Sequence, residues 1–504
     1  MICIGDFIRD NARRVPGRLA LVDAERRWTY AELDRQTDAI AAALIARGVE
    51  PGDRVGLLGQ SSADWVRLFL GIVKSGAIAA GLNYRETPDR LAGMIDDVGI
   101  RLMFADPERR AMMAGSGIGA EVLELSADAC DALAGRRDFA PPPGRAATPS
   151  DGAVILFTGG TTGVSKGVLL THANLFWNVL NEALDTGMNE FDRTLIGTAL
   201  HHSAALNTWL LPTFYLGGTA VVLREFTPED WIATMAREQV TNAFTPPTMI
   251  RQILRHPAAR QVDWSSFRRW YSGAGILPDH ERAEMTQLIP GLEIYYEYGL
   301  TEAGPIVTVL KPQDAGRAPG SIGRAVRNCE IRILREDRSV ADPGEVGELA
   351  VRGPAVMPGY FNRPEESARV FLDGWLLTGD LASIDGEGFV FFHDRSKDMI
   401  KTGGLNVYSQ EVEQVIATHP AVREVAVIGL PDDTWGEAVS AVVTLHDEVT
   451  LGAADLVAYA RERLGGYQTP KRVIFMPYEA LPRNYLGKII KRDLRDALAE
   501  AEVA

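Results

Sequence analysis

One short stretch, residues 156–167, concentrates side chains and backbone freedom suited to binding phosphate. It reads LFTGGTTGVSKG and holds four glycines, three threonines, one serine and one lysine. Glycines let the backbone approach a bulky anion and turn several N–H groups toward it, while hydroxyls and an ammonium add donors and charge. The pattern differs from the P-loop of NTPases, because Ser165 precedes Lys166 and Gly167 follows it. Taken alone, the stretch fits either a phosphate-binding loop or a glycine- and threonine-rich surface turn.

Two apolar runs flank this stretch and predict the elements that hold it. Residues 153–157 (AVILF) lead into it, and residues 168–170 (VLL) lead out of it. A short apolar run bounded by turn residues is typical of a buried strand. We therefore expect a strand, a polar loop and a second strand.

Length and charge bound the class of protein. The chain has 504 residues, which is too long for one hydrophobic core, so two or more domains are expected. Its hydrophobic fraction of 46% and charged fraction of 24% are those of an ordinary globular protein. The net charge of −15 argues against a nucleic-acid or anionic-membrane partner. A site for anionic substrates must therefore concentrate its positive charge locally.

Cysteine usage and the apolar segments indicate a compartment. Cys3, Cys130 and Cys329 show neither a disulfide framework nor a metal-binding spacing. The N-terminal residues lack the apolar core and cleavage site of a secretory signal. The most apolar long stretch, residues 65–82, is interrupted by two basic residues, so no transmembrane helix is expected. These observations predict a cytoplasmic protein.

Alternating helix and strand patterns predict a covered, mostly parallel sheet in the N-terminal part. Thr29 followed by Glu32 is a capping-box pattern, and residues 63–74 have helical spacing between two short apolar strands. A second series of strands and helices follows. From residue 319 to residue 392, glycine-punctuated strands predict a β-rich subdomain.

The sequence changes character at residues 394–398 (DRSKD), a charged, polar link. Beyond it lies a compact α+β pattern, with a last basic helix expected to start near Gly487. We place a domain boundary at the link, which predicts an N-terminal domain of residues 1–394 and a C-terminal domain of residues 395–504. The predicted fold class is α/β, with a large N-terminal domain of covered β-sheets and a β-rich subdomain, followed by a small α+β domain.

Five motifs follow one another along the chain: residues 156–167, 296–302 (YEYGLTE), 374–380 (GWLLTGD), 394–404 (DRSKDMIKTGG) and 482–488 (PRNYLGK). In this order and spacing they resemble the adenylate-forming superfamily of acyl-CoA synthetases, firefly-luciferase-like enzymes and peptide-synthetase adenylation domains. The resemblance covers nearly the whole chain and is greatest to fatty-acyl and aryl-acyl CoA ligases. It implies that a carboxylate attacks the α-phosphorus of ATP, that pyrophosphate leaves, and that CoA then takes the acyl group as AMP is released.

The resemblance implies that the first motif holds the β- and γ-phosphates. The phosphate-binding residues would be Thr158, Gly159, Gly160, Thr161, Thr162, Gly163, Ser165 and Lys166. The family usually has serine where Gly160 stands and proline where Ser165 stands. Neither departure removes the pattern of donors.

The second motif resembles the family's α-phosphate and magnesium residues. Thr301 and Glu302 take these roles, and Glu302 with Thr161 would hold Mg²⁺, because that ion prefers oxygen ligands. Tyr298 and the neighbouring Gly299 would lie beside the adenine. Without this context, a glutamate after a threonine fits a surface helix.

Four single residues carry the remaining implied roles. Asp380 would accept hydrogen bonds from the ribose hydroxyls, and Arg395 would bind ribose or phosphate. Lys488 would bridge the attacking carboxylate and the α-phosphate as negative charge develops. His202 aligns with a histidine that flanks the carboxylate. The alternative for Asp380 is an aspartate in a turn, and that for Arg395 is a solvated charge in a linker. The alternative for Lys488 is one more cation in a basic helix.

In the family, the C-terminal domain rotates between the two reactions about a hinge that matches Lys397. The loop containing Lys401, Gly403 and Gly404 would then replace the loop of the catalytic lysine. Its glycines leave room for the thin pantetheine arm of CoA. The family often has proline where Ser409 stands, which puts the path of this loop in question.

The resemblance also implies an acyl pocket. Its residues would be His202, Asn207, Trp209, Gly273, Ala274, Gly275 and Ile306. The walls are small and apolar, so we expect an apolar acid, fatty or aryl. Amino-acid-activating members carry an aspartate near Ala204, and none is present here. Trp209 also fits the core, and the His201-His202 pair could bind a metal, although no third ligand stands at a suitable spacing.

The expected cofactors are ATP, Mg²⁺ and coenzyme A, and a homodimer is compatible with the sequence. A carrier-protein phosphopantetheine is the alternative acceptor, and it shares every motif named above. A rival of another class is a phosphoryl-transfer kinase or ATPase built on the glycine-rich loop, which would release ADP instead of pyrophosphate. A non-catalytic nucleotide-binding protein is a further alternative, and the retained Lys488, Glu302 and Asp380 argue against it.

Overall fold

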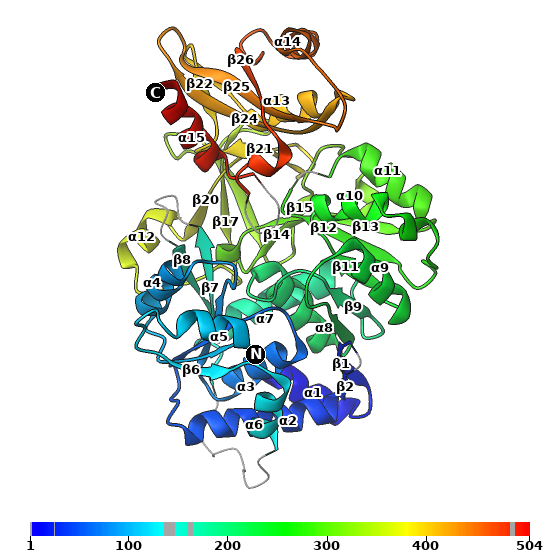
Figure 1. Cartoon of the computed structure of the whole chain (residues 1–504), viewed down its shortest axis with the longest axis vertical. Coiled ribbons are helices and arrows are strands. Elements are labelled where there is room, and N and C mark those ends of the chain that lie inside the picture. Colours follow the sequence, from blue (N-terminus) through cyan, green and yellow to red (C-terminus); the bar gives the residue numbers. More distant parts are fainter. Residues whose placement is uncertain are drawn as a thin grey trace. The chain divides into compact units, whose positions relative to one another are not determined.

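The computed structural model describes residues 3–24, 26–135, 147–159, 165–275, 277–483 and 489–503 (Figure 1). The chain forms two compact units, the larger of residues 1–331 and 351–376 and the smaller of residues 332–350 and 377–504. Among the predicted site residues, Gly160, Thr161, Thr162, Gly163 and Lys488 lie outside the described residues. In the part of the chain that is described, no helix is long and apolar enough to cross a membrane.

The larger unit alternates helices and strands. Its longer helices are α1 (Asp6–Arg14), α2 (Tyr30–Ala46), α3 (Ala63–Lys74), α4 (Pro88–Val98), α5 (Pro107–Met113), α6 (Ala127–Ala134), α7 (His172–Asp185), α8 (Leu211–Leu216), α9 (Pro228–Arg237), α10 (Pro247–Arg255), α11 (Asp279–Leu288) and α12 (Pro364–Val370). Short 3₁₀ turns are η2 (Pro257–Arg260), η3 (Thr301–Ala303) and η4 (Pro312–Asp314), and η1 (Ala204–Leu210) is a π-helix.

All but the last of its strands belong to two main sheets. They are β1 (Leu19–Asp23), β2 (Arg26–Thr29), β3 (Arg54–Leu58), β4 (Ile78–Leu82), β5 (Leu102–Ala105), β6 (Glu121–Glu124), β7 (Gly152–Gly159), β8 (Ser165–Thr171), β9 (Arg193–Ile196), β10 (Thr219–Val222), β11 (Asn242–Phe244), β12 (Arg269–Gly273), β13 (Glu293–Gly299), β14 (Ile306–Leu310), β15 (Arg324–Ala325), β18 (Gly359–Tyr360) and β19 (Phe371–Leu372).

The first sheet has the order β18-β8-β7-β4-β3-β5-β6. Strands β7, β4, β3, β5 and β6 are parallel to one another, and β8 turns back antiparallel to β7. Every residue of β4 is buried, and α4 packs its apolar face against the sheet's core. Parallel strands covered on both faces need no polar alternation. The predicted covered sheet is therefore confirmed.

The second sheet has the order β15-β14-β13-β12-β11-β9-β10-β1-β2. Its six central strands, from β13 to β1, are parallel, and β14 returns antiparallel to β13. Strands β12 and β13 end at Gly273 and Gly299. Ligands of open α/β sheets bind at the carboxyl ends of parallel strands. Both glycines were predicted as site residues, and the topology puts them at such ends.

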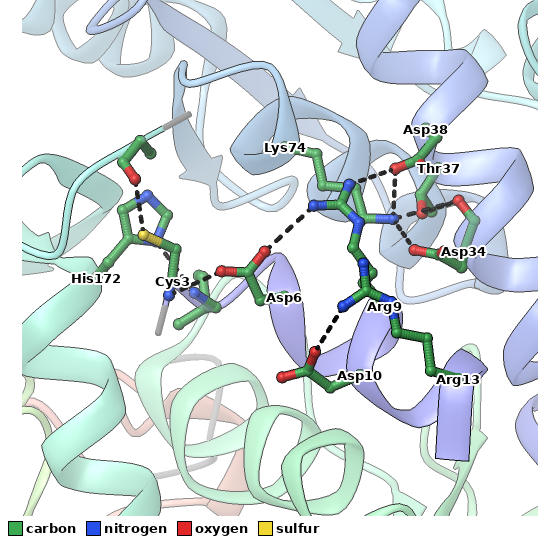
Figure 2. Close-up of polar contacts among 12 residues, drawn as sticks. Cys3, Asp6, Arg9, Asp10, Arg13, Asp34, Thr37, Asp38, Lys74 and His172 are labelled. Carbon is green, nitrogen blue, oxygen red and sulfur yellow. Dashed lines mark hydrogen bonds and ion pairs between the residues drawn. The ribbon is translucent and has the colours of Figure 1, made fainter. Parts of the chain in front are cut away.

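Ion pairs fasten the N-terminal helices together (Figure 2). The ammonium of Lys74 on α3 lies 2.5 Å from a carboxylate oxygen of Asp34 and 2.8 Å from one of Asp38, both on α2. Arg9 on α1 reaches the same Asp38 carboxylate at 3.1 Å. Helix α2 begins with the predicted capping box, because Thr29 and Glu32 each accept a hydrogen bond from the other's backbone N–H.

The smaller unit contains β21 (Val390–Arg395), β22 (Ile400–Thr402), β23 (Leu405–Val407), β24 (Val422–Asp432), β25 (Gly436–Leu445) and β26 (Arg472–Phe475), with α13 (Ser409–Ala417), α14 (Ala453–Arg461), η5 (Tyr478–Ala480) and α15 (Lys491–Val503). Its sheet has the order β23-β22-β25-β24, with β26 beside β25. Helices α13 and α14 cover one face of the sheet, and Leu494 of α15 covers the other. The expected α+β character is confirmed.

Three strands contain the points at which the chain passes from one unit to the other. They are β16 (Glu330–Leu334), β17 (Gly347–Arg352) and β20 (Trp375–Ile384). The compact units therefore do not coincide with residues 1–394 and 395–504. The boundary at residue 394 is placed where one domain is expected to move relative to the other, and a division by contacts does not test that motion. This boundary therefore stays a prediction. The last helix is assigned from Lys491, and its expected start near Gly487 falls outside the described residues.

Candidate active site

The first motif lies at the open end of the β7–β8 hairpin. Thr158 faces Lys166 across the hairpin, and Gly159 faces Ser165. Residues 160–164, which connect the two strands, lie outside the described part. The predicted arrangement of two strands around this motif is confirmed, and it carries Thr158 and Lys166 to the same end of the sheet.

Glu302 lies at the centre of a small polar cluster in the larger unit. Its carboxylate accepts hydrogen bonds from the hydroxyl of Thr158 at 3.3 Å and from the phenol of Tyr360 at 3.1 Å. The ammonium of Lys166 lies 4.9 Å from the centroid of the Tyr360 ring. Burial, and then the charge of Glu302, raise the pKa of Tyr360. The phenol therefore stays protonated and donates to Glu302.

The backbone around Glu302 is fixed by its neighbours. Its carbonyl accepts a hydrogen bond from the N–H of Met357 at 2.9 Å. A Cβ atom at Gly299 would stand 2.1 Å from the carbonyl oxygen of Pro305, so no other residue fits where β13 ends. Leu300 donates its N–H to the same carbonyl at 3.0 Å. The turn that presents Thr301 and Glu302 is thus defined by contacts on both sides.

Thr301 meets the segment that contains the histidine pair. Its hydroxyl lies 2.9 Å from the hydroxyl of Ser203. The rings of His201 and His202 have centroids 3.9 Å apart. Burial, and then the charge of Arg85, lower the pKa of His201 to about 3. Burial and then His201 hold the pKa of His202 well below its ordinary value, so both imidazoles are neutral at pH 7.

A cluster of aromatic rings, called here the aromatic wall, contacts the π-helix that follows the two histidines in the chain. Trp209, on the π-helix η1, packs its ring 4.3 Å from that of Tyr271 and 5.7 Å from that of Phe244. Tyr271 in turn lies 5.2 Å from the ring of Tyr295 on β13. π-Helical turns are rare and are found frequently at functional sites. Trp209 is therefore a buried core residue of this wall, and its place in the acyl pocket stays a prediction.

The other predicted pocket residues come from three elements. Asn178 on α7 joins two of these elements, since its amide donates to the carbonyl of Asn207 at 3.0 Å and accepts from the N–H of Ile306 at 3.0 Å. A Cβ atom at Gly273 would stand 2.4 Å from the carbonyl oxygen of Glu297, so this position must be glycine. Gly275 accepts a hydrogen bond from the phenol of Tyr296 at 2.5 Å.

Ala274, between these two glycines, has a φ of 61°. This left-handed conformation is uncommon for a residue with a side chain, and it recurs at ligand sites. The structure therefore places Gly273, Ala274 and Gly275 at and just after the carboxyl end of β12, and Asn178 links Asn207 with Ile306.

In the smaller unit, the predicted ribose-binding residues are cross-strand neighbours. Asp380 on β20 pairs in register with Arg395 on β21, and their charged groups lie 3.6 Å apart. Asp380 is buried, and its N–H donates to the hydroxyl of Thr378.

The predicted hinge and CoA residues lie on and before a hairpin of the smaller unit. Lys397 is exposed, and Lys401 is the middle residue of β22 and pairs with Asn406 of β23. Gly403 and Gly404 make the two-residue turn with φ angles of 56° and 80°. Two successive positive φ angles suit the type of turn that needs glycine.

Ser409, where the family often has proline, has a structural role of its own. Its N–H and its hydroxyl donate to the carboxylate of Asp394 at 2.5 Å and 2.6 Å. The ammonium of Lys491 donates to the same hydroxyl at 2.5 Å and pairs with Glu413 at 2.7 Å. A proline would lose the N–H and the hydroxyl. Where the family often has proline, this chain therefore has a serine whose hydrogen bonds hold the start of α13.

Several residues that the sequence analysis missed belong to these clusters. Tyr360 follows Pro358 and Gly359 within residues 319–392, for which the sequence predicts only glycine-punctuated strands. Glu182 and Glu297 are buried although their side chains are ionisable. The sequence did offer an indication of this burial, because each glutamate lies in a segment whose other residues are mostly apolar or buried. Among the residues that the structure describes, no three His, Cys, Asp or Glu side chains gather closely enough to hold a metal ion.

The chain is similar to known proteins over nearly its whole length. The chain matches the model of AMP-binding enzymes over residues 8–361 and that of the AMP-binding enzyme C-terminal domain over residues 411–488. It is 36% identical to a feruloyl-CoA synthase of an Amycolatopsis species over 492 residues, which cover 98% of each chain. It is 33% identical to the indoleacetate–CoA ligase of Aromatoleum aromaticum, again over 98% of each chain.

A solved structure is also similar. The o-succinylbenzoate CoA synthetase of Bacillus subtilis, in complex with its acyl-adenylate intermediate, superposes with a TM-score of 0.86 at 30% identity, covering 97% of this chain and 98% of that one. The family model spans most of the chain, and relatives match it from end to end. This chain therefore belongs to the AMP-binding enzymes of the adenylate-forming superfamily.

Proposed function

We propose that this protein is an acid–CoA ligase. It would activate an apolar carboxylic acid, fatty or aryl, with ATP to an acyl-adenylate and pyrophosphate. It would then transfer the acyl group to CoA and release AMP. The observation that carries the proposal is the cluster in which Glu302 accepts hydrogen bonds from Thr158 and Tyr360, with Lys166 beside the same tyrosine.

The first reaction forces two anions together, so positioning and positive charge must supply most of the catalysis. Thr158, Ser165 and Lys166 would hold the β- and γ-phosphates from the end of the hairpin. Thr301 would donate to the α-phosphate from its place beside Ser203. Carboxylate and hydroxyl oxygens suit Mg²⁺, and the cluster of Glu302 and Thr158 has these donors. When bound, that ion would offset negative charge on the phosphates.

The neutral His202 would bind the acid's carboxylate by donating an N–H, with no charge of its own to desolvate. Lys488 is proposed as the cation that bridges the carboxylate and the α-phosphate. Asp380 and Arg395 are proposed for the ribose, which their pairing on adjacent strands supports. Rotation of the C-terminal domain about Lys397 would bring Gly403 and Gly404 into use for the thiol-transfer step.

A pyrophosphate-release screen over a panel of carboxylic acids, with CoA present, tests the proposal. The panel should contain aryl acids, including ferulate and indoleacetate, and fatty acids of graded length. We expect pyrophosphate and AMP as products, and the variant Glu302→Gln should release pyrophosphate about 100-fold more slowly. Release of ADP, or no release with any acid, would contradict the proposal.

The proposal also covers the thiol that accepts the acyl group, the compartment and the oligomeric state. CoA is the proposed acceptor, and a carrier-protein phosphopantetheine is the alternative. Mass spectrometry of products formed with CoA and a carrier protein in competition separates the two. The proposed compartment is the cytoplasm, which suits the free thiols of Cys3, Cys130 and Cys329. A homodimer is open to direct measurement by light scattering.

A further inference from the structure

Helix α7 presents a row of polar residues to the interior of the larger unit. Three of them are well satisfied. Asn174 donates to the carbonyls of Pro354 and Val356, Asn178 joins η1 and β14, and Asp185 pairs with Lys311. Buried polar groups normally have such partners, because an unpaired one costs about 1–3 kcal/mol.

Glu182, on the same face one helical turn after Asn178, is different. Its relative exposure is 0%, and within the described part of the chain neither of its carboxyl oxygens has a hydrogen-bond partner. Burial, and then the charge of Glu297, raise its pKa well above the ordinary value. An acidic side chain thus lies in the interior without a hydrogen-bonding group from the described residues to bind it.

Glu297 is the second such carboxyl group. It is 7% exposed, and one of its oxygens also has no hydrogen-bond partner among the described residues. It stands two residues after Tyr295 on β13, so both side chains point to the same face of the sheet. Its cross-strand neighbour is Gly273, two residues after Tyr271, and that glycine has no side chain to cover it. Burial raises the pKa of Glu297 as well.

A third observation, on another element, is independent of the acidic pair. The side-chain amide of Asn207 on η1 is fully buried, and neither its nitrogen nor its oxygen has a partner among the residues described. Its backbone carbonyl is held by Asn178, which precedes Glu182 by one turn of α7. The indole N–H of Trp209, two residues further on η1, is likewise buried and unpartnered in the described structure.

These unpaired groups lie around the aromatic wall. Trp209 packs on Tyr271, and Tyr271 packs on Tyr295 of the strand that carries Glu297. The charge of Glu297 also acts on Tyr271. The place is therefore aromatic on its walls, and its carboxyl and amide oxygens, from Glu182, Glu297 and Asn207, are hydrogen-bond acceptors without a partner among the described residues. An aliphatic tail would leave them unpaired, whereas a ring with a donor would satisfy them.

We propose that Glu182 and Glu297 form the distal end of the acyl site and select an aromatic carboxylic acid that carries an O–H or N–H donor on its ring. The inference rests on the proposed function and specifies its substrate class. The acid's carboxylate lies toward His202 and Thr301, its ring lies against Trp209 and Tyr271, and its donor reaches the carboxyl groups. Asn207 completes the binding site with its amide.

Matched pairs of acids test this directly in the pyrophosphate-release assay. The first pair is 4-hydroxycinnamate and cinnamate, and the second is indole-3-acetate and 1-naphthylacetate. Each pair differs mainly in one donor, of O–H type in the first and N–H type in the second. We expect the donor-bearing acid of at least one pair to have a kcat/KM at least about tenfold higher, because a site built to bind a donor rejects the analogue without it.

Leucine variants locate the preference. Glu297→Leu and Glu182→Leu should bring the ratio of kcat/KM values within a pair close to one, mainly by improving the acid that has no donor. Glu293→Leu, an exposed glutamate on the same strand, should leave the ratio unchanged. If the leucine variants fail to fold, the inference is still tested on the wild-type protein. The measurements are then the ratio of kcat/KM values within each pair and the rise in Tm that each acid causes.

Two outcomes overturn the inference while leaving the proposed function intact. One is equal turnover of both members of each pair by the wild-type enzyme. The other is a preference that persists in both leucine variants when they are folded. Failure to release pyrophosphate with any acid would instead count against the proposed function itself.

Discussion

At the scale of single residues, the site separates binding from catalysis. Thr158 and Glu302 are held by strand β7, by the turn after β13 and by one another, and Lys166 lies beside Tyr360, which suits residues that bind the phosphates of ATP in the proposed first step. Lys488 belongs to a different motif more than three hundred residues further along the chain. A cation that acts only as charge develops contributes to the rate more than to the binding of ATP.

Lys488→Ala should lower acyl-adenylate formation about 10²- to 10³-fold. Thioester formation from supplied acyl-adenylate should continue, because the attack on the α-phosphate is already complete and pyrophosphate has left. Pyrophosphate release and thioester yield, measured separately, check this. Arg492→Ala, an exposed cation on the last helix, is the control. Equal loss of both reactions would contradict the role given to Lys488.

The buried histidine beside His202 links the site to pH-dependent stability. The pKa of His201 is about 3 in the folded protein, below its ordinary value of 6.5. Between these values the unfolded chain binds a proton that the folded one does not. The free energy of unfolding therefore rises with pH over this window, by up to about 1.4 kcal/mol per pH unit for this group. The raised pKa values of Glu182 and Glu297 act in the opposite direction.

His201→Phe keeps the ring that packs edge-on against Tyr84 and removes the titrating group. Urea unfolding at a series of pH values from 4 to 6.5 should give the variant a shallower rise in stability with pH than the wild type. Identical slopes for the two proteins would show that His201 does not titrate as proposed.

At the scale of elements, the network of α1, α2 and α3 determines how firmly the N-terminal helices hold the first sheet. The side chain of Lys74 is 3% exposed and lies between Asp34 and Asp38. Removing one partner of a buried pair leaves the other charges unpaired, which costs more than the pair itself contributes.

Lys74→Met should lower the free energy of unfolding by about 3 kcal/mol, because it removes the buried cation between Asp34 and Asp38 and leaves only the more exposed Arg9 beside Asp38. Arg9→Met, in the same network but with a side chain 34% exposed, should cost less than about 1 kcal/mol. Chemical denaturation of both variants measures the difference. Equal effects would mean that burial does not decide the contribution of these ions.

At the scale of the whole molecule, one polypeptide must perform two reactions with different geometries. The hairpin turn of Gly403 and Gly404 and the anchor at Ser409 are built into the smaller unit, and each is complete within it. A conformational step between adenylation and thiol transfer would therefore need only the segment around Lys397 to change its backbone angles.

Lys397→Pro should leave pyrophosphate release within about twofold and slow acyl-CoA formation at least about tenfold, because proline fixes φ at the proposed hinge. Lys397→Ala, which keeps the backbone free, is the matched control and should retain both activities. Single-turnover measurements of the two steps distinguish the outcomes. Unchanged overall turnover in Lys397→Pro would argue against a hinge at this residue.

Much of the fold could be predicted from local patterns. The covered parallel sheet followed from strands that are apolar throughout, and the capping box of Thr29 and Glu32 followed from two residues three apart. These features depend on neighbours in the chain, so their physical causes are visible in the sequence. The hairpin around Thr158 and Lys166 was predictable for the same reason.

The sequence by itself determined the class of chemistry, because phosphate-binding glycines and a set of motifs in fixed order need no coordinates to be recognised. The tertiary structure alone decided which residues lie beside those of the proposed site. Tyr360 reaches Glu302 from 58 residues away, and Glu182 and Glu297 become neighbours only when α7 packs on the second sheet. Burial and pairing across long separations decide whether a carboxyl group is a solvated surface charge or an unpaired acceptor, and no local pattern encodes them.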